Sequence, residues 1–584
     1  MYLLRINVKR FLRSPLKLGI FLILSLWISY YFKTTTIFWN AVNKPIDLMI
    51  TVLPYLFLGC LLLSYEMFYD QKRYRVDEIL DMDRRCVFRE RMATWWLLVV
   101  LDLIISVGMF GFQIYCYRQA GVVCGALIKY TLRVIVIYVF LMSLVAIQFG
   151  WIAASARNNL IGLTILVVTF YLFDRRFVSL ILGMDENSRF LWRLGTLFSF
   201  FFQSKRATVR DADYLLSAEN VHVYRALFFL LLTTAVLMWS ELQKRWAAAF
   251  SAIMSVVCLV LFFQPTGAVY NMMEIWNYQD SVFYLERYSQ EDEAKRNTRM
   301  CRENRDDFYA CRYDMDIRVT DQLKASVTIV PSDTSLEQYQ FTLHYLFAVS
   351  KVTDGQGHPL TYRQDGDYLL VESPGDLQQI HIEYEGETSY FYATTQGMIL
   401  PANYEYFPVP GWHKVFINNN DEEEQKILDA TFTREVLSHD AQFKVHLSVK
   451  SDYPVYSNLS CQKQKGEHGF TDWILSGQSN GMTLIGNPYL IDREIDGVKV
   501  VCSRLDLENV PLGENVSRYR EYFRSLRKEC GIKWNGTTFI VSPDCNYINY
   551  CYGDDHTVDT LLGLDTEVRY RKDGILYSYS DLDQ

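Results

Sequence analysis

Residues 94–116 read TWWLLVVLDLIISVGMFGFQIYC, a run of 23 residues with one charged side chain, Asp102. A helix needs about 20 mainly apolar residues to cross the hydrocarbon core of a bilayer, so this stretch predicts a membrane span. Similar runs fill the first 265 residues and none follows, which excludes a wholly soluble protein. We expect seven spans, at 17–36, 47–67, 94–116, 130–155, 159–181, 223–240 and 246–265.

The charge of the chain changes sign where the spans end. Residues 1–265 carry 28 Lys and Arg against 16 Asp and Glu, a net charge of +12, and residues 266–584 carry 30 against 50, a net charge of −20. The acidic part disfavours nucleic acid as a partner. With 584 residues in two such unlike parts, the chain predicts a multi-domain membrane protein in which an α-helical transmembrane bundle precedes a second domain.

The N-terminus indicates how the chain is oriented. In residues 1–16, apolar side chains recur on one helical face and basic ones on the other, which predicts an amphipathic helix in the membrane interface and no cleavable signal peptide. Basic residues gather here and in 68–93, which favours a cytoplasmic N-terminus. With seven spans in 17–265, the chain after Pro265 would then be extracellular.

Two segments between spans differ from simple loops. Residues 182–222 are apolar but broken by charges, so we expect outer re-entrant or interfacial helices, with an ordinary amphipathic loop as the alternative. Residues 68–93 alternate basic and acidic side chains, with apolar residues spaced for one helical face. Such a helix could dock on a cytoplasmic partner. The alternative is a solvated linker that fixes the topology.

The basic amphipathic N-terminus and the stretch RVDEILDMD at 75–83 resemble the type-two permeases of ATP-binding-cassette transporters. In that family the first feature is an elbow helix, and the second belongs to a coupling helix that sits on the ATPase subunit. The resemblance covers about residues 1–245 and implies six core spans, so the span at 246–265 is an addition. By position, it implies that the residues contacting the ATPase are Asp77, Glu78, Leu80, Asp81 and Arg84.

The same resemblance implies partners. The sequence contains no G-x-x-x-x-G-K-[ST] motif, and therefore no phosphate-cradling loop of that type. We expect no cofactor in this chain, and ATP with Mg²⁺ on a separate ATPase subunit. A second permease subunit, identical or related, would complete the transporter.

Polar residues inside the expected spans are few, and Asp102, Gln113 and Gln148 stand out among them. A carboxyl group is costly in a membrane and is a candidate functional group for that reason. Because its span is expected to begin at residue 94, Asp102 would lie about two turns from the cytoplasmic end. Snorkelling toward water, or a hydrogen bond to another helix, is therefore favoured over a role in transport.

From residue 313 the hydrophobic pattern has a period of two. Stretches such as YDMDIRVTD, KASVTIV and QIHIEYEG alternate apolar and polar residues, and turns such as QDGD and SPGD separate them. This predicts an extracellular, mainly-β domain over 313–512, a β-sandwich or a curved sheet. We expect the aromatic stretch 404–412 to form an edge of its core rather than a peptide-binding face. Residues 266–312 indicate a linker with helical parts, and 513–584 a short α/β part.

The order of YDMDIRVTD, KASVTIV, IHIEYEG and FKVHLSVKSDYPVYSN resembles the N-terminal β-domain of the gluzincin aminopeptidases, the aminopeptidase N family. The resemblance covers about 312–545 and implies that the chain ends in a truncated part of a peptidase-like domain. A zinc peptidase of this kind needs H-E-x-x-H, which none of the nine His forms; His439 and His446 are seven residues apart. The sequence therefore predicts no catalytic residues and no metal site.

Seven of the twelve cysteines lie in the acidic part. In an oxidising space, Cys301 could pair with Cys311 and Cys545 with Cys551, with free thiols as the alternative. The acidic run at 418–425 is expected to be a solvated hairpin tip rather than a calcium loop.

These observations predict the permease subunit of a bacterial exporter in the plasma membrane, with a non-catalytic outer domain that captures substrate or gates its exit. The substrate would be a peptide such as a bacteriocin, or a similar amphipathic molecule. The transporter would either export it or give the cell immunity to it. A membrane-anchored peptide receptor or sensor without transport is the alternative. A membrane peptidase is disfavoured by the histidine pattern.

Overall fold

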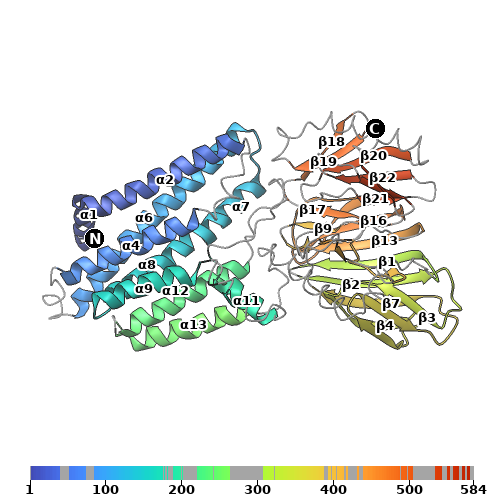
Figure 1. Ribbon diagram of the computed structural model, residues 1–584, viewed down its shortest axis with the longest axis horizontal. Helices are drawn as coiled ribbons and strands as arrows, with labels where there is room; N and C mark the ends of the chain where they lie inside the picture. Colours follow the sequence, from blue (N-terminus) through green and yellow to red (C-terminus); the bar gives the residue numbers. More distant parts are fainter. Residues whose placement is uncertain are drawn as a thin grey trace. The chain divides into compact units, whose positions relative to one another are not determined.

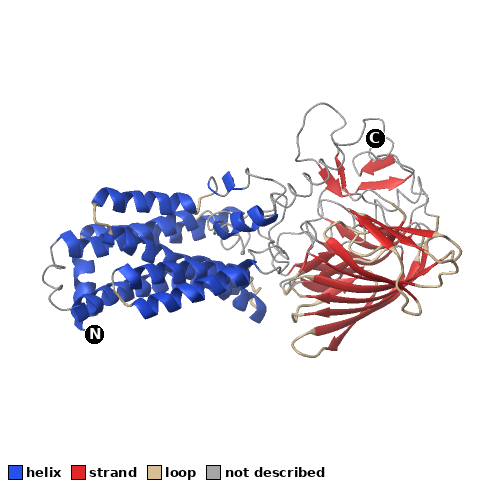
Figure 2. Cartoon of the chain, turned by 90° about the horizontal axis from the view of Figure 1, so that it is seen from below, coloured by secondary structure: helices blue, strands red, loops and turns tan. Residues whose placement is uncertain are grey.

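The computed structural model divides the chain into two units, one of helices and one of strands (Figures 1 and 2). The prediction of a helical N-terminal part followed by a mainly-β part is thereby confirmed. The structure describes residues 2–39, 52–73, 84–174, 177, 180–181, 189–198, 200, 220–240, 243–263, 307–320, 322–386, 392–395, 397–400, 402, 404–412, 416–418, 430–432, 439–479, 481–486, 488, 490–495, 498–503, 533–541, 549–552, 557–563, 569–572 and 575–578.

The helical unit follows the apolar runs of the sequence. Within the described residues its helices are α1 (Tyr2–Arg13), α2 (Pro15–Trp39), α4 (Leu53–Arg73), α6 (Arg84–Gln119), α7 (Gly125–Val134), the π-helix η2 (Ile135–Leu141), α8 (Met142–Ser155), α9 (Asn159–Leu172), α11 (Arg189–Phe198), α12 (Asn220–Ser240) and α13 (Arg245–Phe263).

Several of these helices are suited to a membrane. Among the described residues, four are long and apolar enough to cross one: Phe88–Gln119, Leu127–Ser155, Asn220–Ser240 and Arg245–Phe263. The pair α1 and α2, bent by 81°, would be a fifth if it is one span. Because α9 has only 14 residues, the number of seven spans stays a prediction.

Helices α4 and α8 approach each other closely. A Cβ added to Gly150 of α8 would lie 2.5 Å from the carbonyl oxygen of Leu61 and 2.7 Å from Cβ of Ser64, both on α4. The Ser64 hydroxyl donates a hydrogen bond of 2.6 Å to the carbonyl oxygen of Ile147 on α8. Glycine is therefore required at 150 because two backbones meet there.

Helix α13 packs on α12 through one narrow face. Its buried residues include Ala248, Ser251 and Ser255, which are small and recur along one side. The Ser255 hydroxyl donates to the carbonyl oxygen of Phe228 on α12 at 3.0 Å. The other side exposes large apolar residues, Phe250 among them, a surface typical of helices that face lipid.

The β unit is built on a seven-stranded sheet with the order β15-β16-β13-β1-β2-β7-β4. Strands β1 and β13 lie side by side and run parallel although they are far apart in sequence, and the other pairs in this sheet are antiparallel (Figure 1). The bounds are β15 (Ser460–Lys465), β16 (Thr471–Ser479), β13 (Ala441–Val449), β1 (Ala310–Val319), β2 (Leu323–Pro331), β7 (Ile380–Gly386) and β4 (Phe347–Asp354).

Smaller sheets accompany it. Strands β18, β19, β20, β22 and β21 form one sheet that joins residues on both sides of the boundary expected at 512. The helix expected near 515 lies outside the described residues. The remaining strands are β3 (Gln338–Thr342), β5 (Tyr362–Asp365), β6 (Tyr368–Glu372), β8 (Tyr392–Ala393), β9 (Met398–Leu400), β10 (Val409–Pro410), β11 (Phe416–Asn418), β12 (Ala430–Phe432), β14 (Val455–Ser457), β17 (Leu484–Gly486), β18 (Leu490–Ile495), β19 (Val498–Ser503), β20 (Lys533–Val541), β21 (Asn549–Tyr552), β22 (Thr557–Gly563), β23 (Arg569–Lys572) and β24 (Ile575–Ser578).

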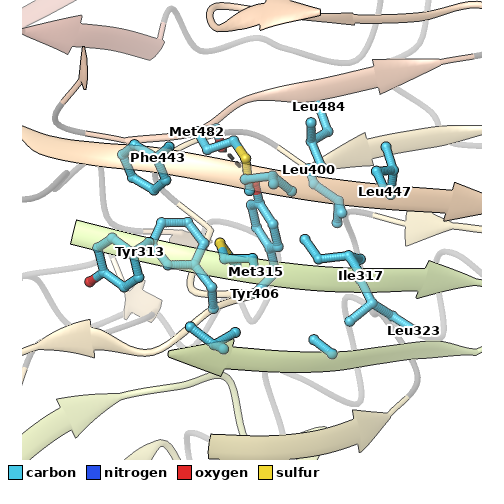
Figure 3. Packing of buried hydrophobic residues seen from close by; sticks show 14 of the residues in the cluster. Tyr313, Met315, Ile317, Leu323, Leu400, Tyr406, Phe443, Leu447, Met482 and Leu484 are labelled. Carbon is cyan, nitrogen blue, oxygen red and sulfur yellow. Dashed lines mark hydrogen bonds between the residues drawn. The ribbon is translucent and has the colours of Figure 1, made fainter. Parts of the chain in front are cut away.

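One face of the large sheet carries the core, as the alternating pattern requires. Tyr313, Met315 and Ile317 of β1 are buried and pack with side chains of neighbouring segments (Figure 3). Tyr313 stacks on Phe443 of β13 with ring centroids 5.1 Å apart. Tyr406 is fully buried and donates a 2.7 Å hydrogen bond to the carbonyl oxygen of Met482. The stretch 404–412 is therefore part of the core, as predicted.

His344, between β3 and β4, is the buried histidine of this core. Its Nδ1 accepts a hydrogen bond of 3.3 Å from the N–H of Leu346, and its ring lies 5.1 Å from that of Tyr404. Burial lowers the pKa of His344 to about 3, because a charged imidazolium is poorly solvated among apolar side chains.

The stability of the β unit should therefore depend on pH through His344. Between pH 6.5 and about 3 the unfolded chain binds a proton that the folded chain does not, so this contribution is complete above pH 6.5 and is lost as the pH falls toward 3. We expect the wild type to lose about 1.4 kcal/mol per pH unit more than His344→Gln in this range. Pulse proteolysis of the full chain measures this. His358→Gln, an exposed histidine, is the control, and equal slopes for wild type and His344→Gln would contradict the expectation.

Gly150 offers a test of the contact between α4 and α8. Gly150→Ala should destabilise the helical unit by about 1–3 kcal/mol, because the added methyl group overlaps backbone atoms. Gly108→Ala is the matched control, since a Cβ there meets nothing within 4 Å; it should leave stability unchanged or raise it by up to about 1 kcal/mol. Thermal unfolding in detergent, followed by circular dichroism, compares the two. Equal midpoints would show that the helices are not in close contact.

Candidate functional site

The segment that the permease resemblance assigns to ATPase contact joins two described helices. Helix α4 ends at Arg73 and α6 begins at Arg84. Asp77, Glu78, Leu80 and Asp81 lie outside the described residues, and of Arg84 only the backbone is described. Their contact with an ATPase stays a prediction.

The described residues show how the start of α6 is held. Asn7 of α1 donates a 3.0 Å hydrogen bond from Nδ2 to the hydroxyl of Thr94 on α6. One turn away, Nη1 of Arg10 lies 3.3 Å from Oε1 of Glu90, whose side chain is almost fully buried. The amphipathic helix therefore docks its polar groups onto α6, and a buried carboxylate is compensated by a basic partner.

A third contact ties the end of α4. Lys17, in the first turn of α2, forms an ion pair with Asp70 in the last turn of α4. Lys17 is buried and Asp70 is partly exposed. Because α1 and α2 are consecutive, the N-terminal 17 residues contact both helices that flank residues 74–83.

Asp102 lies near the middle of α6, not near its end. The helix begins ten residues before the span expected at 94, and at 1.5 Å per residue this places Asp102 about 27 Å from Arg84. Its side chain is 2% exposed. Of the two arrangements expected for Asp102, snorkelling and a hydrogen bond to another helix, snorkelling is not seen, because the side chain does not reach the surface. The carboxyl instead interacts with the hydroxyl of Ser143 on α8.

The two glutamines are both buried, and Gln148 contacts another helix. Nε2 of Gln148 on α8 donates 2.9 Å to the hydroxyl of Thr234 on α12, and the hydroxyl of Thr233 donates to Oε1 of Gln148. Gln113 of α6 is fully buried and interacts with the hydroxyl of Tyr117. Gln148 therefore joins α8 to α12, where an amide can satisfy polar groups of a neighbouring helix, and the contact of Gln113 with Tyr117 lies within α6.

The sequence analysis missed Arg225 and His222 of α12. Both are fully buried. Nη1 of Arg225 donates 3.1 Å to the carbonyl oxygen of Thr196 in the last turn of α11, and its guanidinium lies 5.0 Å from the ring centroid of Phe200. The His222 ring lies 5.8 Å from that of Tyr138 in the π-helix. The available signal was the spacing of two ionisable residues, three apart, inside the apolar stretch VHVYRALFF.

No metal site or disulfide is established by the described residues. Among them, no three His, Cys, Asp or Glu side chains are placed to hold a metal ion. His446 lies 3.5 Å from Asp316, and His439 packs on Tyr309. Cys311 is a free, exposed cysteine. Cys301 and Cys545 lie outside the described residues, as does the side chain of Cys551, so the pairings stay predictions.

Solved structures similar to part of this chain include zinc peptidases. The M1 zinc metallopeptidase from Deinococcus radiodurans is 14% identical with a TM-score of 0.31, and the match covers 41% of this chain and 57% of the peptidase. Native yeast LTA4 hydrolase is 14% identical with a TM-score of 0.27, and the match covers 44% of this chain and 40% of the hydrolase. This chain thus spans less than two thirds of either protein. No protein-family model and no curated protein matches the sequence.

Arg225 should hold α11 in place. The last carbonyls of a helix lack partners within it, and a basic side chain satisfies them. Arg225→Met removes this donor and should speed hydrogen exchange of amides in α11 by at least tenfold, as the loss of about 1.5–3 kcal/mol implies. Arg245→Met, at an exposed arginine of the same unit, is the control. Unchanged exchange in Arg225→Met would show that α11 is held by its apolar contacts alone.

Proposed function

We propose that this chain is the permease subunit of an ATP-binding-cassette exporter in a bacterial plasma membrane. It would work with a separate ATPase subunit that binds ATP and Mg²⁺ and with a second permease subunit, identical or related. The N-terminus would be cytoplasmic and the β unit extracellular. The substrate would be a peptide or a similar amphipathic molecule.

The observation that carries the proposal is the set of contacts made by the first 17 residues. An amphipathic helix turned by 81° from the next helix has the shape of a helix lying in a membrane interface. Its contacts with Glu90 and Thr94, in the second and third turns of α6, and the contact of Lys17 with Asp70, in the last turn of α4, attach the N-terminal residues to both helices. Because both helices that flank the charged segment 74–83 are attached to the N-terminal residues, a movement of this segment caused by a cytoplasmic partner would also move α4 and α6.

The mechanism follows from that arrangement. Closure of the ATPase subunits around ATP would move residues 76–84, and the helices joined to them would shift between two states of the bundle. The buried pairs between helices, such as Gln148 with Thr233 and Thr234, would then be remade in each state.

The β unit would act in this transporter without catalysis. The sequence lacks H-E-x-x-H, so the two histidines and the glutamate that a gluzincin uses to bind zinc and activate water are missing. We propose that the unit captures substrate or gates its exit.

The first experiment is extraction in a gentle detergent from the native host, followed by mass spectrometry of the proteins that stay bound. A bound ATPase with a Walker loop supports the permease. A chain that comes out alone, or bound to a kinase, supports a membrane-anchored receptor or sensor instead.

Reversing the charges of the coupling segment should uncouple the ATPase. We expect the double substitution Asp77→Lys and Glu78→Lys to abolish the stimulation of ATP hydrolysis by the reconstituted permease, because it reverses the charge that the partner's surface would have to complement. Glu385→Lys, a charge reversal on the exposed face of the β unit, is the control. Retained stimulation in the double variant, with an unchanged unfolding temperature, would refute the assignment of this segment.

A further inference from the structure

The interior of the helical unit contains a carboxyl group with no basic partner among the described residues. Asp102 is 2% exposed. Burial and the hydroxyl of Ser143 are the influences on its carboxyl, and no Lys, Arg or His is among them. The other ionisable side chains buried toward the N-terminal end differ, since Lys17 and Glu90 each have a partner of opposite charge.

Polar groups around Asp102 are also left without ordinary hydrogen bonds. Neither carboxyl oxygen of Asp102 makes a hydrogen bond of normal geometry in the described part of the chain, and the same holds for the hydroxyls of Ser143 and Ser106. Ser106 lies one turn from Asp102 on the same side of α6. The thiol of Cys60 on α4 interacts with both Asp102 and Ser143. Buried polar atoms without partners point to an occupant such as an ion or ordered water.

The backbone next to this cluster is unusual. The π-helix η2 ends at Leu141, two residues before Ser143. Short π-helical segments inside α-helices occur frequently at functional sites, because the wider turn displaces backbone groups from their regular partners. Asp102 of α6 and Ser143 of α8 therefore interact next to a widened turn.

We propose that Asp102 and Ser143 form a binding site for a small monovalent cation, either a proton or Na⁺. The bound cation neutralises the carboxyl group inside the bundle, where an uncompensated charge would be costly. Carboxyl and hydroxyl oxygens are suitable ligands for either cation. Cation occupancy would then contribute to the stability of the bundle through mass action.

The test measures the unfolding temperature of the purified full chain in detergent, without any ATPase, so that it does not depend on the proposed transport. One series varies NaCl at constant ionic strength with choline chloride, and another varies pH from 5 to 9. Asp102→Asn keeps the shape and removes the charge. Glu66→Gln, at a partly exposed carboxyl group of α4, is the matched control.

The expected result is that the wild type responds where Asp102→Asn does not. If the cation is Na⁺, NaCl raises the unfolding temperature of the wild type and of Glu66→Gln by several degrees and leaves Asp102→Asn unchanged. If the cation is a proton, the wild type loses stability relative to Asp102→Asn as the pH rises, because the bound proton is lost. Identical responses of wild type and Asp102→Asn in both series would overturn the site.

If the Asp102→Asn variant does not fold, a second measurement on the wild type tests the site without it. Dicyclohexylcarbodiimide modifies protonated carboxyl groups in apolar surroundings, and mass spectrometry of the wild-type chain locates the modified residue. If modification of Asp102 decreases as the pH rises, the bound cation is a proton. If NaCl protects Asp102 from modification, the bound cation is Na⁺. Modification that neither pH nor NaCl changes would overturn the proposal.

Discussion

A polar group placed among apolar helices must find its partner on another helix, and this constraint determines much of the helical unit. The ion pairs of Lys17 and Glu90 and the amide contacts of Gln148 each join two helices. Apolar side chains alone would allow the helices to slide or rotate against one another, since one apolar surface resembles the next. Each polar pair has a single position at which it closes, so these pairs define the register of the bundle.

The β unit is specified in another way. Its large sheet buries alternate residues, and several tyrosines of its core donate hydrogen bonds to backbone carbonyls, as Tyr406 does to Met482 and Tyr384 does to Tyr406. Such a core combines large aromatic contacts with polar ends that close in one geometry. In both units, the pairing of buried polar groups therefore favours one arrangement. These pairs join helices in the helical unit, and they join strands to loops in the β unit.

The sequence predicted the elements better than their ends and contacts. Apolar runs and period-two stretches identified the helices and the strands because both patterns are local. The sequence analysis placed Asp102 near the end of its helix because α6 begins ten residues before the apolar run. Those ten residues include several charged ones, so hydrophobicity alone does not identify them as helix. Arg225 stands near the start of the span expected at 223–240, and only the placement of α11 shows its contact with Thr196. The parallel pairing of β1 with β13 joins distant segments, which no local pattern reveals.

The π-helix carries a consequence for how this chain can vary. A π-helical turn holds an extra residue compared with an α-helical one, and each residue of an α-helix accounts for about 100° of rotation. The seven residues of Ile135–Leu141 therefore turn the helix about as far as six residues of a regular α-helix would. Deleting one residue there would restore a regular helix and leave the residues before and after it in the same relative orientation, so Gln148 would still face α12. What such a deletion would remove is the widened turn next to Ser143, so the extra residue affects this turn and not the alignment of α8.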